Sequence, residues 1–200
     1  MPRQNKILIA YIVVFFAALA WSGINPEDQF TWFLEVAPAL AVFAILAATF
    51  KFFRFSNFSY FIILLHTIIL MIGGHWTYAE VPLFNWLKDA FDLARNYYDR
   101  VGHFAQGFVP VLVLREIVIR QNVFNGKKWQ AAFLVMAVLG ASAFYEFFEW
   151  WTALLAGASA DAFLGTQGDV WDTQADMLMC FIGSVFALVL LSKLQDKYLK

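Results

Sequence analysis

Long apolar runs alternate with short polar segments along the whole chain. Six of these runs approach or exceed the roughly 20 residues that a helix needs to cross a membrane. The pattern predicts an all-α polytopic membrane bundle, folded as a single integral membrane domain over residues 1–200. The expected spans cover about residues 7–24, 30–50, 58–76, 101–119, 129–155 and 170–191.

The first apolar run follows a basic start, as the apolar core of a signal peptide would. The run is long enough to span, however, and the ALAWSG that closes it is a poor cleavage site. We therefore expect an uncleaved first membrane helix.

The polar segment between the third and fourth runs, VPLFNWLKDAFDLARNYYDR, is amphipathic. A short helix lying at the membrane interface would explain this pattern, and an ordinary ordered loop is the alternative. One face of that helix would carry Leu83, Trp86, Leu87, Ala90 and Phe91.

Composition supports a membrane protein, because 62% of the residues are hydrophobic and only 14% are charged. Soluble domains average about 45–50% apolar and about 25% charged residues. The lipid bilayer is therefore the expected partner of most of the surface. A net charge of −1 and the lack of a long basic tract argue against a nucleic-acid partner. The single cysteine, Cys180, lies in an apolar run and excludes a disulfide framework.

The basic residues predict the orientation. Of the 14 Lys and Arg residues, all but Lys88, Arg95 and Arg100 fall on one side of the expected spans, together with both termini. Positive residues concentrate in cytoplasmic loops, so both termini should be cytoplasmic. The acidic residues show the opposite bias, since only Glu116 and Asp196 of the 15 fall on the cytoplasmic side. A solvated helix flank would explain Glu116.

Most of the remaining acidic residues fall in the outer loops or near the outer ends of the spans, and several share a helix face. Asp99 and His103 are spaced i,i+4, and Glu146 and Glu149 are spaced i,i+3. We expect a polar layer just below the periplasmic face, to which five spans contribute. Its members are Glu35, His75, Asp99, His103, Glu146, Glu149, Asp169, Asp172 and Asp176.

A carboxylate a turn or more inside a span costs several kcal/mol unless it is paired or hydrated, so Glu146 and Asp176 call for a function. With His103 they form a hypothetical catalytic acid/base set or a ligand set for a divalent metal such as Zn²⁺, Mn²⁺ or iron. Further binding residues would be Asp99, Glu149, Asp172 and His75.

Other interpretations of these residues stay open. The carboxylates could share protons as a relay, or recognise the cationic or hydroxylated head group of a lipid or envelope precursor. A small-molecule or proton-coupled transporter and a purely structural polar network are further alternatives. Asp169 and Asp172 could be helix N-caps, and Asp99 could be a cap or pair with Arg95 or Arg100. His66, alone in mid-membrane, is expected to serve packing.

Three stretches, DRVGHFAQGFVPVLVLRE, YEFFEWW and GDVWDTQADM, carry a family resemblance. With Gly183 they resemble the YjdF-like family of predicted bacterial inner-membrane proteins, over most of the chain. The resemblance implies a multi-pass protein of the inner (cytoplasmic) membrane and brings no activity with it.

A more distant likeness is to VanZ-like membrane proteins, which are associated with glycopeptide (teicoplanin) resistance. Their motifs match Asp99, Arg100, His103, Glu146, Asp176 and Gly183. Arg100 replaces a Lys, Glu149 replaces a Gln, and Cys180 stands where Asn is usual. The shared positions are the polar cluster. We therefore expect a polar carboxylate/His site near the periplasmic face that takes a metal ion or a head group.

Overall fold

The computed structural model describes residues 3–157 and 161–199. All the regular secondary structure in these ranges is helical. Six helices are long and apolar enough to cross a membrane. This confirms the all-α membrane bundle, and most helix ends lie within about four residues of those expected. The six are α1 (Arg3–Ser22), α2 (Gln29–Thr49), α3 (Asn57–His75), α5 (Tyr98–Arg120), α6 (Lys127–Ala156) and α8 (Asp172–Gln195).

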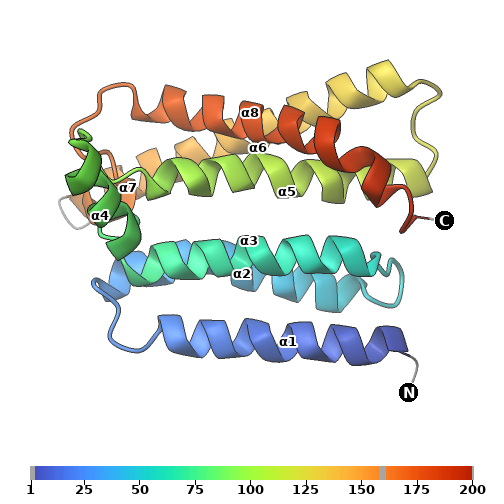
Figure 1. Cartoon of the computed structure of the whole chain (residues 1–200), viewed down its shortest axis with the longest axis horizontal. Helices are drawn as coiled ribbons and strands as arrows, with labels where there is room; N and C mark the ends of the chain where they lie inside the picture. Colours follow the sequence, from blue (N-terminus) through green and yellow to red (C-terminus); the bar gives the residue numbers. More distant parts are fainter. Residues whose placement is uncertain (1–2, 158–160, 200) are drawn as a thin grey trace.

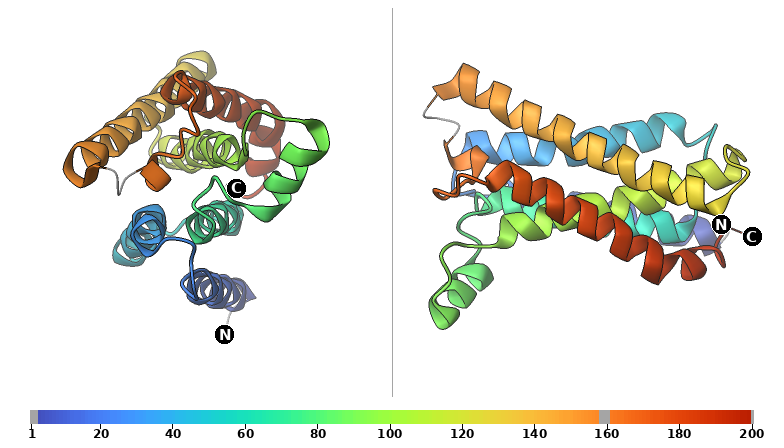
Figure 2. Two further views of the ribbon diagram at one scale, coloured as in Figure 1. Left: turned by 90° about the vertical axis from the view of Figure 1, so that its left-hand side faces the viewer. Right: turned by 90° about the horizontal axis from the view of Figure 1, so that it is seen from above.

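Helices α1, α2 and α3 lie together on one side of the bundle, and α5, α6 and α8 on the other (Figures 1 and 2). Helix α3 packs against α5 and joins the two groups. The closest helix pair is α5 with α8. A Cβ added to Gly107 of α5 would overlap the carbonyl of Cys180, and one added to Gly183 of α8 would overlap that of Phe104. These two glycines therefore allow the backbones to touch, as small residues do between membrane helices.

Two short helices flank the end of the bundle opposite the termini, called the outer end below after the predicted orientation. Helix α4 (Pro82–Phe91) confirms the helix expected between the third and fourth spans, and begins with a proline. It points away from the bundle (Figure 2), with Leu83, Trp86 and Phe91 more than 60% exposed. Such a face suits the membrane interface. Helix α7 (Asp161–Leu164) was not expected from the sequence.

The two termini lie at the same end of the bundle (Figure 1). Contacts between distant segments join them to the basic loops at that end. Arg54 donates to Asn5 Oδ1 over 2.9 Å, and Arg115 to Asp196 Oδ1 over 2.6 Å. The polar layer expected at the periplasmic face lies at the other end, at the start of α5.

Glu116 is not a solvated flank residue, so that expectation was wrong. The side chain is fully buried and accepts hydrogen bonds from the backbone N–H of Ser56 (2.7 Å) and the hydroxyls of Ser56 (2.8 Å) and Ser59 (2.5 Å). Arg120 lies 3.0 Å away on the same helix. Glu116 thus acts as a cap on the N-terminus of α3, where a carboxylate complements the free N–H groups and the dipole.

We predict that the end carrying the termini faces the cytoplasm. A fluorescent protein fused after Leu199 should fold and emit, while alkaline phosphatase at the same position should be inactive. Fusions in the loop after Phe91 should show the reverse. An active C-terminal phosphatase would invert the orientation and place the polar layer on the cytoplasmic side.

We predict that Glu116→Gln lowers the free energy of unfolding by about 2 kcal/mol, the range for hydrogen bonds to a charged acceptor. The change keeps the shape of the side chain but replaces one carboxylate oxygen by an NH₂ group. That group cannot accept the hydrogen bonds that Ser56 and Ser59 donate. Thermal unfolding in detergent measures the effect, with Glu27→Gln, an exposed residue at the opposite end, as control. If Glu116→Gln and Glu27→Gln had the same melting temperature, the Glu116 cap would contribute nothing to stability.

Candidate functional site

The outer aspartates belong to an ion-pair network built around Arg95 and Arg100. Both arginines are buried. Arg95 contacts Asp172 directly, and Arg100 contacts Asp176 directly and Asp172 at 2.8 Å. Longer contacts add Asp169 to both arginines and Asp99 to both. Two guanidiniums thus share four carboxylates at the outer end of α5 and α8.

The capping interpretation of these aspartates was wrong. Helix α8 begins at Asp172, after Trp171, and shows no side-chain cap. Asp169 lies before the helix and accepts from the Trp171 N–H over 2.9 Å. That N–H, followed by the two guanidiniums, lowers the pKa of Asp169 below its usual value. Asp99 is the second residue of α5, whose N-cap residue is Tyr97.

The loop before α5 is also tied to the loop before α8 by backbone contacts. The backbone N–H and carbonyl of Asn96 each bond the side-chain amide of Gln167, both at 2.9 Å. Arg95 donates to the carbonyls of Gly165 (2.8 Å) and Thr166 (3.1 Å). Sequence reasoning noted that the arginines could pair with Asp99 but missed these partners. The i,i+4 spacing of Arg95 and Asp99 was the only local signal.

His103 lies between two groups of acids and is 6% exposed. Its Nε2 is 3.5 Å from Asp99 Oδ1 and 3.7 Å from Asp176 Oδ1. Its Nδ1 is 2.9 Å from Gln106 Oε1 and 4.0 Å from Glu146 Oε1. The ring therefore connects the ion-pair network on α8 with the glutamates on α6.

The residues expected to act together fall into two groups that share this histidine. In one, Asp99, His103 and Asp176 offer ligand atoms within 4.8 Å of one another, and in the other His103, Glu146 and Glu149 do. Asp176 is already paired with Arg100. Glu146 is 7% exposed, and its Oε1 is buried without a hydrogen-bond partner among the described residues. The second group therefore holds a carboxylate oxygen that no described residue uses.

A cavity of about 100 Å³ opens beside this second group, between the two halves of the bundle. Its acidic walls come from three helices: Glu35 on α2, Asp99 on α5 and Glu149 on α6. His66 also lines it, and its Nε2 is buried without a partner. His66 thus lies on the wall of this cavity, and its expected packing role stays a prediction. The other lining residues are Pro38, Leu70, Tyr78, Gly102, His103, Gln106 and Tyr145.

Tyr78 reaches the cavity because two glycines make room for its ring. A Cβ on Gly73 of α3 or on Gly102 of α5 would overlap the ring, so Tyr78 is wedged between these helices. Thr77 and Tyr78 both adopt left-handed backbone, with φ of 52° and 55°, which is uncommon outside glycine. Burial, and then the nearby Glu35, raises the pKa of the Tyr78 phenol well above its usual value. The phenol therefore keeps its proton and remains a donor.

His75 does not join the cluster. Its Nδ1 lies 3.0 Å from the carbonyl oxygen of Ser22, and its ring packs against Trp21 and Trp76 at centroid distances of 4.8 and 4.5 Å. These contacts fix the end of α3 against the end of α1. Its expected role in binding stays a prediction without a contact to the other site residues.

Comparison with known proteins settles the family. The model of the family described as "Predicted membrane protein (DUF2238)" matches residues 7–197. The chain belongs to this family. It is also 43% identical over 182 residues to "Inner membrane protein YjdF" of Escherichia coli (strain K12), covering 91% of this chain and 87% of that protein. No solved structure matches the chain.

Family membership and the six spanning helices together make this a multi-pass inner-membrane protein. The resemblance to the YjdF-like family drawn from the sequence is confirmed. The buried His and carboxylate cluster lies within the matched residues, so it is part of the family domain rather than an appended segment.

We predict that Arg100→Gln is strongly destabilising, by about 3–5 kcal/mol, because it leaves buried carboxylates without their partner. Thermal unfolding in detergent would measure the loss. Lys88→Gln, on the projecting helix α4, is the control for removing one positive charge. If Arg100→Gln has the same melting temperature as the parent, the ion-pair network does not hold α5 to α8.

Proposed function

We propose that the outer end of the bundle binds a divalent cation through His103, Glu146 and Glu149. The observation that carries the proposal is the Oε1 atom of Glu146, which is buried, has no hydrogen-bond partner among the described residues and lies 4.0 Å from His103 Nδ1. An unpaired polar atom of this kind costs free energy, and a bound ion would offset that cost.

The distribution of charged side chains around His103 supports binding of a cation there. The four outer aspartates have Arg95 and Arg100 beside them, whereas no lysine or arginine in the described ranges lies within ion-pair distance of Glu35, Glu146 or Glu149. Carboxylates buried inside a membrane protein must be neutralised by a proton or by a cation. An ion among these glutamates would neutralise them where no lysine or arginine does.

The donor set suits Zn²⁺ or Mn²⁺, which accept imidazole and carboxylate ligands. His103 would bind through Nδ1, while Nε2–H points to Asp99, the arrangement that usually orients a metal-bound histidine. Gln106 Oε1, 2.9 Å from the same Nδ1, could add a neutral oxygen. A metal here would supply a Lewis acid at the cavity wall.

The cavity also indicates what kind of molecule could meet the ion. Its walls carry the carboxyl groups of Glu35, Asp99 and Glu149, whose oxygens can accept hydrogen bonds from hydroxyl or amine groups. The phenol of Tyr78 and the amide of Gln106 offer hydrogen bonds to such groups. Among lipid or envelope precursors, this favours a hydroxylated or cationic head group.

A proton-holding network is the second candidate function. His103 has oxygen atoms near both ring nitrogens, from Asp99 and Asp176 on one side and Gln106 and Glu146 on the other. A ring placed in this way can hold a proton on each nitrogen, and the carboxyls could exchange protons with it. Such a network would need no metal.

We predict that Zn²⁺ or Mn²⁺ raises the melting temperature of the detergent-purified protein. An ion at 100 times its Kd adds about 2.7 kcal/mol to stability. Glu146→Gln and Glu149→Gln should fold but lose this stabilisation, and Asp89→Asn, an exposed carboxylate on α4, should keep it. Elemental analysis of the protein as purified should show the same ion.

Two results would contradict the metal proposal. The parent and Glu146→Gln could respond equally to the ions, which would place the binding elsewhere. Alternatively, no divalent ion could stabilise the parent or co-purify with it. The second result would favour the proton-holding network.

A further inference from the structure

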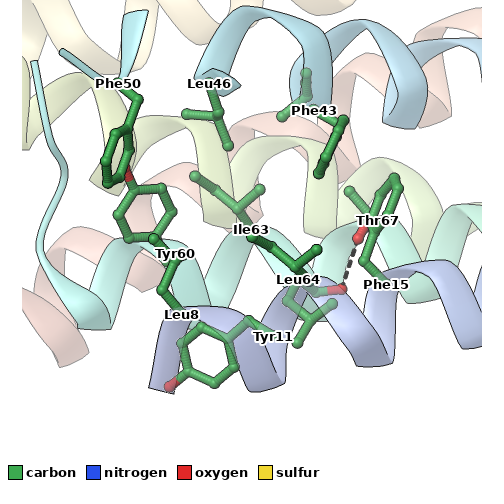
Figure 3. Close-up of a pocket in the computed structure, with 12 residues that line it drawn as sticks. Leu8, Tyr11, Phe15, Phe43, Leu46, Phe50, Tyr60, Ile63, Leu64 and Thr67 are labelled. Atoms are coloured by element: carbon green, nitrogen blue, oxygen red, sulfur yellow. Dashed lines mark hydrogen bonds between the residues drawn. The ribbon is translucent and has the colours of Figure 1, made fainter. Parts of the chain in front are cut away.

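A second feature lies at the opposite end of the molecule and is independent of the proposed metal site. An apolar groove of about 100 Å³ runs between α1, α2 and α3 in the half nearest the termini (Figure 3). Phe15 of α1 and Phe43 of α2 stack at 5.0 Å between ring centroids in its lining. The other lining residues are Leu8, Tyr11, Ile12, Val42, Leu46, Phe50, Tyr60, Ile63, Leu64 and Thr67.

One polar atom in the groove lacks a partner. Thr67 has its hydroxyl bonded to the Leu64 carbonyl at 2.8 Å, the dashed line in Figure 3. Tyr60 is 7% exposed, and its Oη has no hydrogen-bond partner among the described residues. A buried phenol usually has an acceptor. A molecule bound in the groove should therefore supply an acceptor oxygen to the Tyr60 hydroxyl as well as apolar groups.

The mouth of the groove is basic. The guanidinium of Arg54 lies 5.3 Å from the ring centre of Phe50, which lines the groove, and donates one hydrogen bond to Asn5. A neighbouring cavity of about 380 Å³ is lined by Arg54 and Arg120 together with Ser56 and Asn57. The exposed Lys51 follows Phe50 directly in the chain.

The two acids at this end do not neutralise that charge. Glu116 also lines the neighbouring cavity, but it is buried and is used by the N–H and hydroxyl groups at the start of α3 and by Arg120. Asp196 pairs with Arg115. Arg54 and Lys51 have no carboxylate within ion-pair distance among the described residues. The mouth therefore presents positive charge to the surface of the leaflet on the side of the termini.

These properties select one kind of occupant. A helix is about 10 Å across with its side chains, too wide for a cavity of this volume. An acyl chain is apolar and narrow, its ester oxygens can accept from Tyr60, and a phosphate with net negative charge complements Arg54 and Lys51. We infer that the groove between α1, α2 and α3 binds an anionic phospholipid, with one acyl chain between the helices and the phosphate at Arg54.

Native mass spectrometry tests this inference with defined lipids. The full-length protein in detergent is mixed with phosphatidylglycerol or with phosphatidylcholine of the same acyl chains. We expect phosphatidylglycerol to bind more tightly, and Arg54→Gln to weaken it about fivefold, the effect of one surface cation of about 1 kcal/mol. Lys193→Gln, an exposed lysine of α8 at the same end, should leave this binding unchanged.

A second set of variants tests the groove itself. Val42→Trp places bulk at the rim of the groove and should displace the lipid, whereas Ile45→Trp places the same bulk on the lipid-facing side of α2. Tyr60→Phe removes the unpaired hydroxyl, so it should fold at least as stably as the parent while binding phosphatidylglycerol more weakly.

Equal binding of the two lipids, or equal effects of Val42→Trp and Ile45→Trp, would overturn the inference. Because the metal experiments and the lipid experiments use different residues and ligands, failure of one leaves the other standing. If Val42→Trp does not fold, Tyr60→Phe and Arg54→Gln still decide the question.

Discussion

Buried charge inside a membrane bundle must be neutralised, and this constraint organises the outer half of the protein. Water is scarce there, so each carboxylate needs a guanidinium, a proton or an ion. Arg95 and Arg100 meet this need for the aspartates of α8 and the start of α5. The same contacts hold the two loops and the two most closely packed helices together. In the described part of the chain, Glu35, Glu146 and Glu149 are left without a lysine or arginine partner.

The division between the paired and unpaired acids follows from geometry. The α5–α8 contact is close because Gly107 and Gly183 let the backbones touch, and it brings the aspartates within reach of the arginines. Helix α6 does not come within ion-pair distance of either arginine in the described part of the chain. On the other side of α5, the wedge of Tyr78 fills the space between α3 and α5 and forms one wall of the acidic cavity.

The sequence predicted the spans because each apolar run is a local property of its own helix. It also predicted that His103, Glu146 and Asp176 would lie at one depth, since depth follows from position in a span. It could not predict the pairing of Arg100 with Asp176, which depends on how residues 76 positions apart approach. The burial of Glu116 was missed for a similar reason, because the burial of a side chain depends on the helices packed beside it. The left-handed backbone at Thr77 and Tyr78 has no signature in these residue types.

The ion-pair network bears on how the chain assembles in the bilayer. Membrane helices generally insert before they pack. Arg95 lies just before α5 and Arg100 in its first turn, but their carboxylate partners Asp172 and Asp176 arrive only with α8, the last helix that the structure describes. Of the carboxylates that pair with these arginines in the described residues, only Asp99 is synthesised before residue 169. Helix α8 completes both the closest packing and the charge balance, so a chain that stops before α8 would keep His103, Glu146 and Glu149 but leave Arg95 and Arg100 without Asp172 and Asp176.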